Sequence, residues 1–153
     1  IALGVGMQVL AADKFIDKVS VPVTLFNGAS VSVEISTLPM NEVLKKSDFL
    51  SLHVPAQKKY VLGKKEFAMM KDGAVVVNAA RGGVLDEVAL VDALDSNKLA
   101  FAALDTFENE PKPEVKLLMH PKISLTPHIG AATLEAQDRI GEELANQIIS
   151  LLG

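Results

Sequence analysis

The sequence contains no cysteine, which excludes disulfide bonds, thiolate metal sites and a cysteine nucleophile. It also lacks any apolar run near the ~18–20 residues that a membrane-spanning helix needs, so we expect no membrane partner. No block of basic residues is present, and 15 Lys and Arg against 19 Asp and Glu give a net charge of -4. Nucleic acid is therefore not an expected partner. Together these absences favour a cytoplasmic enzyme.

Arginine is scarce, because only Arg81 and Arg139 occur among the 15 basic residues. A guanidinium group offers a planar, permanently charged fork that binds a carboxylate through two hydrogen bonds. Gly82 and Gly83 follow Arg81 and would let a ligand approach closely. Arg81 is therefore a candidate carboxylate-binding residue, and an ordinary surface arginine in a turn is the alternative.

The 153 residues are 49% hydrophobic and 22% charged, a composition typical of one globular domain. Hydrophobic patterning predicts strands at 7–13, 49–54, 74–78, 100–104 and 123–126. It predicts helices at 41–46, 64–70, after a cap at Asp86, and at 133–152, and residues 1–4 resemble the last turn of a helix. This alternation predicts an α/β fold with a doubly wound parallel sheet. Residues 21–35 alternate around Asn27-Gly28 and predict a β-hairpin.

Polar side chains follow the predicted strands at the points where the strands end. They are Asp13, His53, Asn78 with Arg81, Asp105 and His128. Because ligands bind at the carboxyl ends of parallel strands, this set predicts an active site at one edge of the sheet. A metal site is not expected, since cysteine is absent and no two histidines have the spacing of helical metal ligands.

Four motifs occur in an order that is characteristic of a known family. They are Ser47–Pro55 (SDFLSLHVP), Val77–Val84 (VNAARGGV), Ala103–Pro111 (ALDTFENEP) and Leu125–Gly130 (LTPHIG). Together they resemble the D-isomer-specific 2-hydroxyacid dehydrogenases, over the whole chain except the hairpin. The resemblance implies a Rossmann-type fold and hydride transfer between NAD and a small-molecule 2-hydroxy or 2-keto acid. It also implies a homodimer of the full-length chain.

The resemblance assigns catalytic roles to three residues. Arg81 corresponds to the arginine that binds the substrate carboxylate and keto oxygen, and Glu110 and His128 correspond to the acid–base pair. These roles suit the residue types, because histidine exchanges protons near neutral pH and a carboxylate beside it stabilises the imidazolium. Without the family pattern, Glu110 would be interpreted as a solvated loop acid and His128 as a loop histidine.

The resemblance also assigns cofactor-binding residues. They are Asp13 at the adenosine ribose, His53, Val54 and Pro55 around the adenine, Ala79, and Asp105 at the nicotinamide carboxamide. The negative charge of Asp13 favours a free 2′-hydroxyl and therefore NAD over NADP. Lys14 beside it is a small argument in the other direction.

The sequence departs from the family at its phosphate-binding loop. Gly4-Val-Gly-Met-Gln-Val9 has Val9 where the third glycine of Gly-x-Gly-x-x-Gly belongs, and Gly4 lies nine residues before Asp13 instead of about 20. We therefore expect an incomplete Rossmann fold that lacks its first strand. The 153 residues would be a portion of a longer polypeptide, or would fold only with a partner that fills the gap. Residues 1–130 would be a partial NAD-binding domain, and 131–153 a helix leading back to an absent substrate domain. Alone, the piece should bind NAD poorly.

The segment Thr126–Gly130 narrows the range of substrates that the family resemblance implies. It looks more like the family members that act on phosphoglycerate or on glyoxylate and hydroxypyruvate than like those that act on lactate or formate. The first expectation is the pair 3-phosphoglycerate and 3-phosphohydroxypyruvate, in serine biosynthesis. The alternatives are a glyoxylate/hydroxypyruvate reductase and a non-catalytic, NAD-sensing interaction module of the corepressor type.

Overall fold

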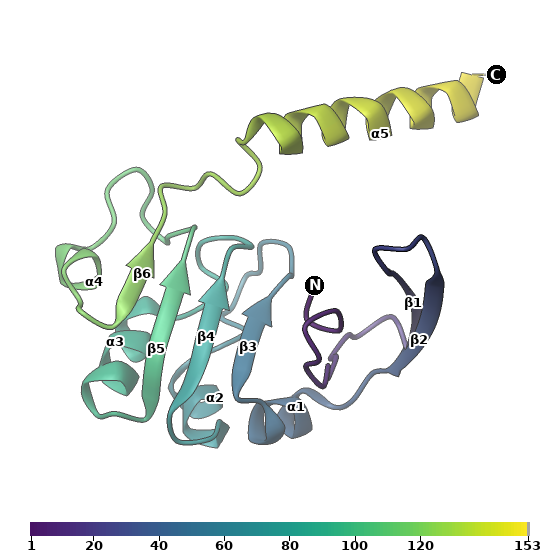
Figure 1. Cartoon of the computed structure of the whole chain (residues 1–153). Coiled ribbons are helices and arrows are strands. Elements are labelled where there is room, and N and C mark those ends of the chain that lie inside the picture. The colour runs from purple at the N-terminus through teal and green to yellow at the C-terminus, as the bar shows by residue number, and fades with distance from the viewer. Residues whose placement is uncertain (153) are drawn as a thin grey trace.

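The structure, a computed structural model, describes residues 1–152 and has an α/β architecture (Figure 1). Its main sheet is parallel and contains β3 (Phe49–Leu52), β4 (Ala74–Asn78), β5 (Leu99–Leu104) and β6 (Ile123–Leu125), in the spatial order β3-β4-β5-β6. The Rossmann-type parallel sheet and four of its five predicted strands are thus confirmed. All four strands point the same way, so their carboxyl ends lie along one edge.

Three helices form a layer on one face of this sheet. They are α1 (Met40–Lys46), α2 (Lys64–Met69) and α3 (Glu87–Asp95), and a short helix, α4 (Val115–Leu118), lies beside β6 (Figure 1). Asp86 caps α3 as predicted, because its Oδ1 accepts a hydrogen bond from Ala89 N at 2.9 Å.

The core lies between this helix layer and the sheet. Leu50, Val76 and Ala102 are paired neighbours on β3, β4 and β5, and all three are buried. Phe49 and Phe101 alternate with them and are 64% and 42% exposed on the other face. A doubly wound sheet carries helices on both faces, whereas the helix layer α1–α3 covers only one face in the described part of the chain.

The predicted hairpin is present as a separate two-stranded sheet. Strands β1 (Lys18–Thr24) and β2 (Ser30–Ser36) pair antiparallel, with Val21 opposite Val33. Gly28 takes the positive φ of 83° that the turn requires, and Asn27 Oδ1 accepts a hydrogen bond from Ala29 N.

The predicted strand over 7–13 is wrong. This segment makes only one isolated bridge, between Ala11 and Thr37, and β3 pairs with β4 alone among the described strands. The physical reason is that a strand needs a neighbouring strand to satisfy its backbone groups, and the described chain offers none here.

The predicted end of a helix is present as a single helical turn, in which Val5 N donates to Ile1 O at 3.1 Å and Met7 N donates to Ala2 O at 3.0 Å. The glycine with positive φ that closes this turn is Gly6 (φ 81°), two residues later than the predicted stop at Gly4.

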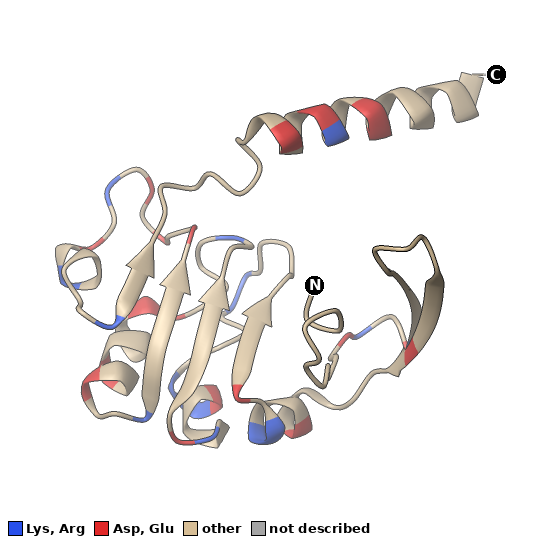
Figure 2. Ribbon diagram, in the orientation of Figure 1, with Lys and Arg blue, Asp and Glu red and all other residues tan. Residues whose placement is uncertain are grey.

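The last helix, α5 (Leu134–Leu152), extends away from the sheet (Figure 1). It confirms the predicted helix over 133–152. The charged residues of α5 lie in the first half of this helix (Figure 2). The strands β3–β6 of the main sheet carry no charged residue. The apolar side chains Ile140, Leu144 and Ile148 are about half exposed. Among the described helices, none combines the length and apolar character that crossing a membrane requires.

Candidate functional site

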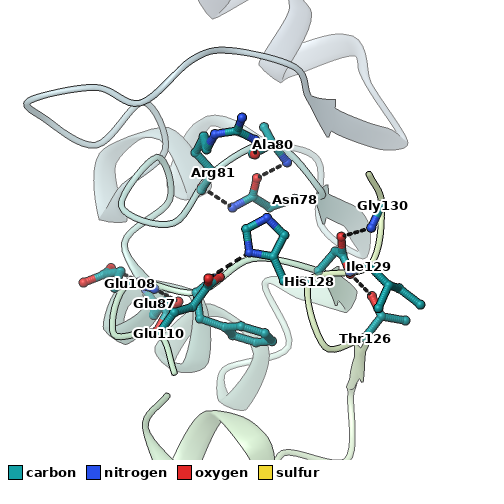
Figure 3. A network of polar contacts seen from close by, with 12 residues as sticks. Asn78, Ala80, Arg81, Glu87, Glu108, Glu110, Thr126, His128, Ile129 and Gly130 are labelled. Carbon is teal, nitrogen blue, oxygen red and sulfur yellow. Dashed lines mark hydrogen bonds and ion pairs between the residues drawn. The ribbon is translucent and has the colours of Figure 1, made fainter. Parts of the chain in front are cut away.

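Loops that follow β4, β5 and β6 bring the candidate residues to one edge of the sheet (Figure 3). The first loop is shaped by Asn78, the last residue of β4, which is only 2% exposed. Its Nδ2 donates to Arg81 O at 3.0 Å, and its Oδ1 accepts from Ala80 N at 3.1 Å. Asn78 thereby sets the backbone path at the loop that carries Arg81.

Glu110 and His128 form a hydrogen-bonded pair, as expected from their motifs. His128 Nδ1 lies 2.8 Å from Glu110 Oε2, and the other oxygen, Oε1, accepts from Phe107 N at 2.9 Å. The hydrogen bond with His128 and then that with the Phe107 amide lower the pKa of Glu110. When Nδ1–H donates to the carboxylate, Nε2 of the half-exposed His128 is the nitrogen that can exchange a proton with a ligand.

Asp105 holds the loop that carries His128. Its Oδ1 accepts from Thr126 Oγ1 at 2.6 Å and from Ile129 N at 2.9 Å, and its Oδ2 accepts from Gly130 N at 2.9 Å. Burial alone would raise the pKa of this carboxyl group, but the three hydrogen bonds outweigh burial and lower it. These contacts also hold His128 at its positive φ of 54°. The contact with nicotinamide implied for Asp105 stays a prediction.

Replacing Asp105 with asparagine is expected to lower the free energy of unfolding at pH 7 by about 1–3 kcal/mol, because the amide cannot accept all three hydrogen bonds. The folded-state pKa lies below the unfolded value of about 3.9, so the carboxylate stabilises the fold above that pH and loses this effect as the pH falls through the folded pKa. Urea denaturation between about pH 7 and pH 2 should show a weaker acid dependence in Asp105→Asn than in the wild type.

The control for this prediction is Asp92→Asn, at an exposed position of α3. It should leave both the stability at neutral pH and its acid dependence nearly unchanged. An Asp105→Asn variant that loses stability on acidification as steeply as the wild type would contradict the role given to Asp105.

Arg81 lies at the same edge of the sheet but does not line the cavity that Glu110 and His128 share. A cavity of about 420 Å³ is lined by Glu110 and His128 together with apolar side chains such as Phe107 and Leu125, and Arg81 is not part of its wall. The exposed guanidinium turns back onto its own backbone, where Nη1 donates to Ala80 O at 2.6 Å. In the view of Figure 3, the His128 ring lies between the side chains of Arg81 and Glu110.

The sequence indicates that Gly82 admits a ligand, but in the structure it faces the backbone of Phe107. A Cβ at this position would lie 1.9 Å from Phe107 O, so the backbone of the β5–α4 loop occupies that space. The Arg81 loop and the Glu110 loop therefore touch directly. Asn78 stands at a strand end, where the sequence predicts site residues. Sequence reasoning missed the buried Glu87, since it lies at no position that local patterning singles out.

The candidate adenosine-binding residues belong to other segments than Glu110 and His128, since Asp13 precedes β1 and His53 follows β3. Asp13 is exposed, and its Oδ1 accepts from Phe15 N and Ile16 N at 2.7 and 3.1 Å. His53 Nε2 pairs with Ser51 Oγ at 2.9 Å beyond the end of β3. Within residues 1–152, no glycine-rich turn leads from a strand next to β3 into a helix. The described residues thus include candidates that would contact the adenosine end of a dinucleotide and, at Asp105, its nicotinamide end. They include no turn whose backbone N–H groups could bind the pyrophosphate between the two ends.

The chain is similar in sequence to known proteins of one family. Residues 1–130 match the family model of the D-isomer specific 2-hydroxyacid dehydrogenase, NAD binding domain. The chain is 41% identical over 157 residues to the hydroxypyruvate reductase of Thermotoga maritima, a match that covers 99% of this chain and 47% of that protein. It is 39% identical over 148 residues to the D-3-phosphoglycerate dehydrogenase of Archaeoglobus fulgidus, covering 95% of this chain and 26% of that protein.

The fold of the chain is also similar to that of a solved dehydrogenase structure. The D-lactate dehydrogenase of Aquifex aeolicus, complexed with NAD and lactic acid, matches with a TM-score of 0.70 at 29% identity, over 98% of this chain and 47% of that one. The chain thus spans about half the length of this relative and of the reductase, and about a quarter of the phosphoglycerate dehydrogenase.

Proposed function

Because the chain belongs to the D-isomer specific 2-hydroxyacid dehydrogenase family, we propose that it supplies the cofactor-binding part and the acid–base pair of an NAD-dependent oxidoreductase. The whole protein would interconvert a 2-hydroxy acid and the corresponding 2-keto acid. The observation that carries this proposal is the 2.8 Å contact between Glu110 and His128 at the carboxyl edge of the sheet.

Each residue of the proposed site has a separate task. His128 Nε2 gives a proton to the oxygen of the keto group as that group is reduced, and Glu110 at Nδ1 stabilises the imidazolium and fixes the ring. Arg81 binds the substrate carboxylate through its guanidinium group, which has five N–H donors and gives one of them, at Nη1, to Ala80 O. NAD, when bound, supplies or receives the hydride.

The cofactor would contact residues of 1–130, which we propose as the NAD-binding domain, with 131–153 leading to a substrate domain. The proposed contacts are Asp13 at the ribose, His53, Val54 and Pro55 at the adenine, and Asp105 at the nicotinamide carboxamide. Ala79 is a further proposed contact with the cofactor. Because the described residues have no cradle for the pyrophosphate, the 153-residue chain by itself should bind NAD weakly.

For the substrate we propose 3-phosphoglycerate and 3-phosphohydroxypyruvate, the pair of serine biosynthesis. The likeness to the Archaeoglobus D-3-phosphoglycerate dehydrogenase supports this choice. The second candidate is hydroxypyruvate or glyoxylate, which the likeness to the Thermotoga hydroxypyruvate reductase favours.

Steady-state oxidation of NADH by the whole protein tests both the proposed NAD-dependent activity and the proposed substrate. Phosphohydroxypyruvate, hydroxypyruvate, glyoxylate and pyruvate should be compared, and we expect the highest kcat/KM with phosphohydroxypyruvate. A higher value with hydroxypyruvate or glyoxylate would select the second candidate. Failure to oxidise NADH with any 2-keto acid would contradict the proposed activity itself.

A further inference from the structure

Two glutamates outside the acid–base pair exchange hydrogen bonds with each other's backbone. Glu87 is the first residue of α3, and Glu108 lies in the loop after β5. Glu108 N donates to Glu87 Oε1 at 2.8 Å, and Glu87 N donates to Glu108 Oε1 at 3.1 Å. Tyr60 Oη donates to the remaining oxygen, Glu108 Oε2, at 3.1 Å. The loop after β5 is therefore tied to the start of α3 (Figure 3).

This pair of contacts lies directly before Glu110 in the chain. Glu108 is two residues away, and the amide of the preceding residue, Phe107, is the one that holds Glu110 Oε1. On its other side, the Phe107 carbonyl packs against Gly82. The backbone from 107 to 108 is thus held by α3 and by the Arg81 loop, and its amide orients the carboxylate that faces His128.

Placing these carboxyl groups together is electrostatically unfavourable. Glu87 is only 7% exposed, and burial, followed by the charges of Glu108, Glu114 and Glu110, raises its pKa even though the Glu108 amide acts in the opposite direction. A buried apolar side chain would avoid this cost but could not accept the Glu108 N–H. The carboxyl group of Glu87 therefore serves as the hydrogen-bond acceptor for Glu108 N, which a side chain that only filled space could not do.

We propose that Glu87 and Glu108 are positioning residues for the acid–base pair, and that their crossed backbone hydrogen bonds hold segment 107–110 so that Glu110 Oε2 stays against His128 Nδ1. Their catalytic meaning rests on the function proposed above. Their geometric role can be tested without turnover.

The test compares Glu87→Ala, which removes the acceptor for Glu108 N, with Glu87→Gln, which keeps an oxygen there. The pKa of Glu110 is followed by NMR of the protein labelled with ¹³Cδ-glutamate, and its resonance is assigned with Glu110→Gln. We expect Glu87→Ala to raise the pKa of Glu110 towards that of ordinary glutamate, and Glu87→Gln not to raise it. Loss of the Glu87 charge alone would act in the opposite direction, so a rise reports displacement of the carboxylate.

Amide hydrogen exchange provides the second measurement. In Glu87→Ala, the Glu108 amide should exchange about tenfold faster, and the Phe107 amide should follow it, while Glu87→Gln restores slow exchange. Asp92→Ala, on the exposed side of the same helix, should change neither measurement. If Glu87→Ala does not fold, Glu108→Ala and Glu108→Gln take its place, because Glu108 accepts the reciprocal bond from Glu87 N.

The two proposals fail in different ways. Removing His128 as His128→Ala should also raise the pKa of Glu110, since that contact is the main cause of its lowering. If His128→Ala has no such effect, the acid–base pair itself is wrong. If His128→Ala raises the pKa of Glu110 and Glu87→Ala does not, the pair stands and the positioning role is overturned.

Discussion

Gly82→Ala is expected to destabilise the protein more than any other single methyl addition to the described glycines. The added Cβ would lie 1.9 Å from Phe107 O and 2.5 Å from Phe107 C, both of them backbone atoms that cannot rotate away. The two loops must separate, which should lower the free energy of unfolding by about 3 kcal/mol or more. Urea denaturation monitored by circular dichroism measures the change.

Gly141→Ala is the matched control for this substitution. Gly141 lies within α5, and a Cβ there meets no atom within 4 Å. Because alanine is the better helix former, this variant should be as stable as the wild type or more stable by up to about 1 kcal/mol. Equal stability of Gly82→Ala and the wild type would show that the two loops do not touch in solution.

His128→Ala is expected to remove most of the turnover of the whole enzyme while leaving NADH affinity nearly unchanged. The variant loses the group that we propose to protonate the keto oxygen, and general acid catalysis contributes about 10²–10⁴-fold to a rate. Glu110→Gln should lose less, because the amide oxygen can still accept from Nδ1 while the charge that favours the imidazolium is gone. Steady-state kinetics and NADH fluorescence titration measure the two quantities separately.

His120→Gln is the histidine control for this experiment. His120 follows α4 and pairs with Asp95 at 3.2 Å, away from the Glu110–His128 contact. Its replacement should leave turnover unchanged. Parallel loss of turnover and NADH affinity in His128→Ala would show that His128 binds the cofactor instead of moving a proton.

The sequence by itself determined the elements whose cause is local. The continuous apolar segment Ala74–Asn78, the alternating strands around Asn27-Gly28 and the cap at Asp86 each carry their own signal over a few residues, and all three form as predicted. The meeting of Glu110 and His128 could be expected as well, because their motifs follow adjacent parallel strands and strand ends share one edge.

Only the tertiary structure decided the rest, because each of these features depends on a partner distant in sequence. Residues 7–13 are apolar enough for a strand but have no strand to pair with in the described part of the chain. Gly82 is needed for the Phe107 carbonyl, which lies 25 residues further along the chain, and not for a ligand. The bonds between Glu87 and Glu108 join the start of α3 to the loop after β5. No local pattern encodes their approach, since it follows from the parallel pairing of β4 with β5.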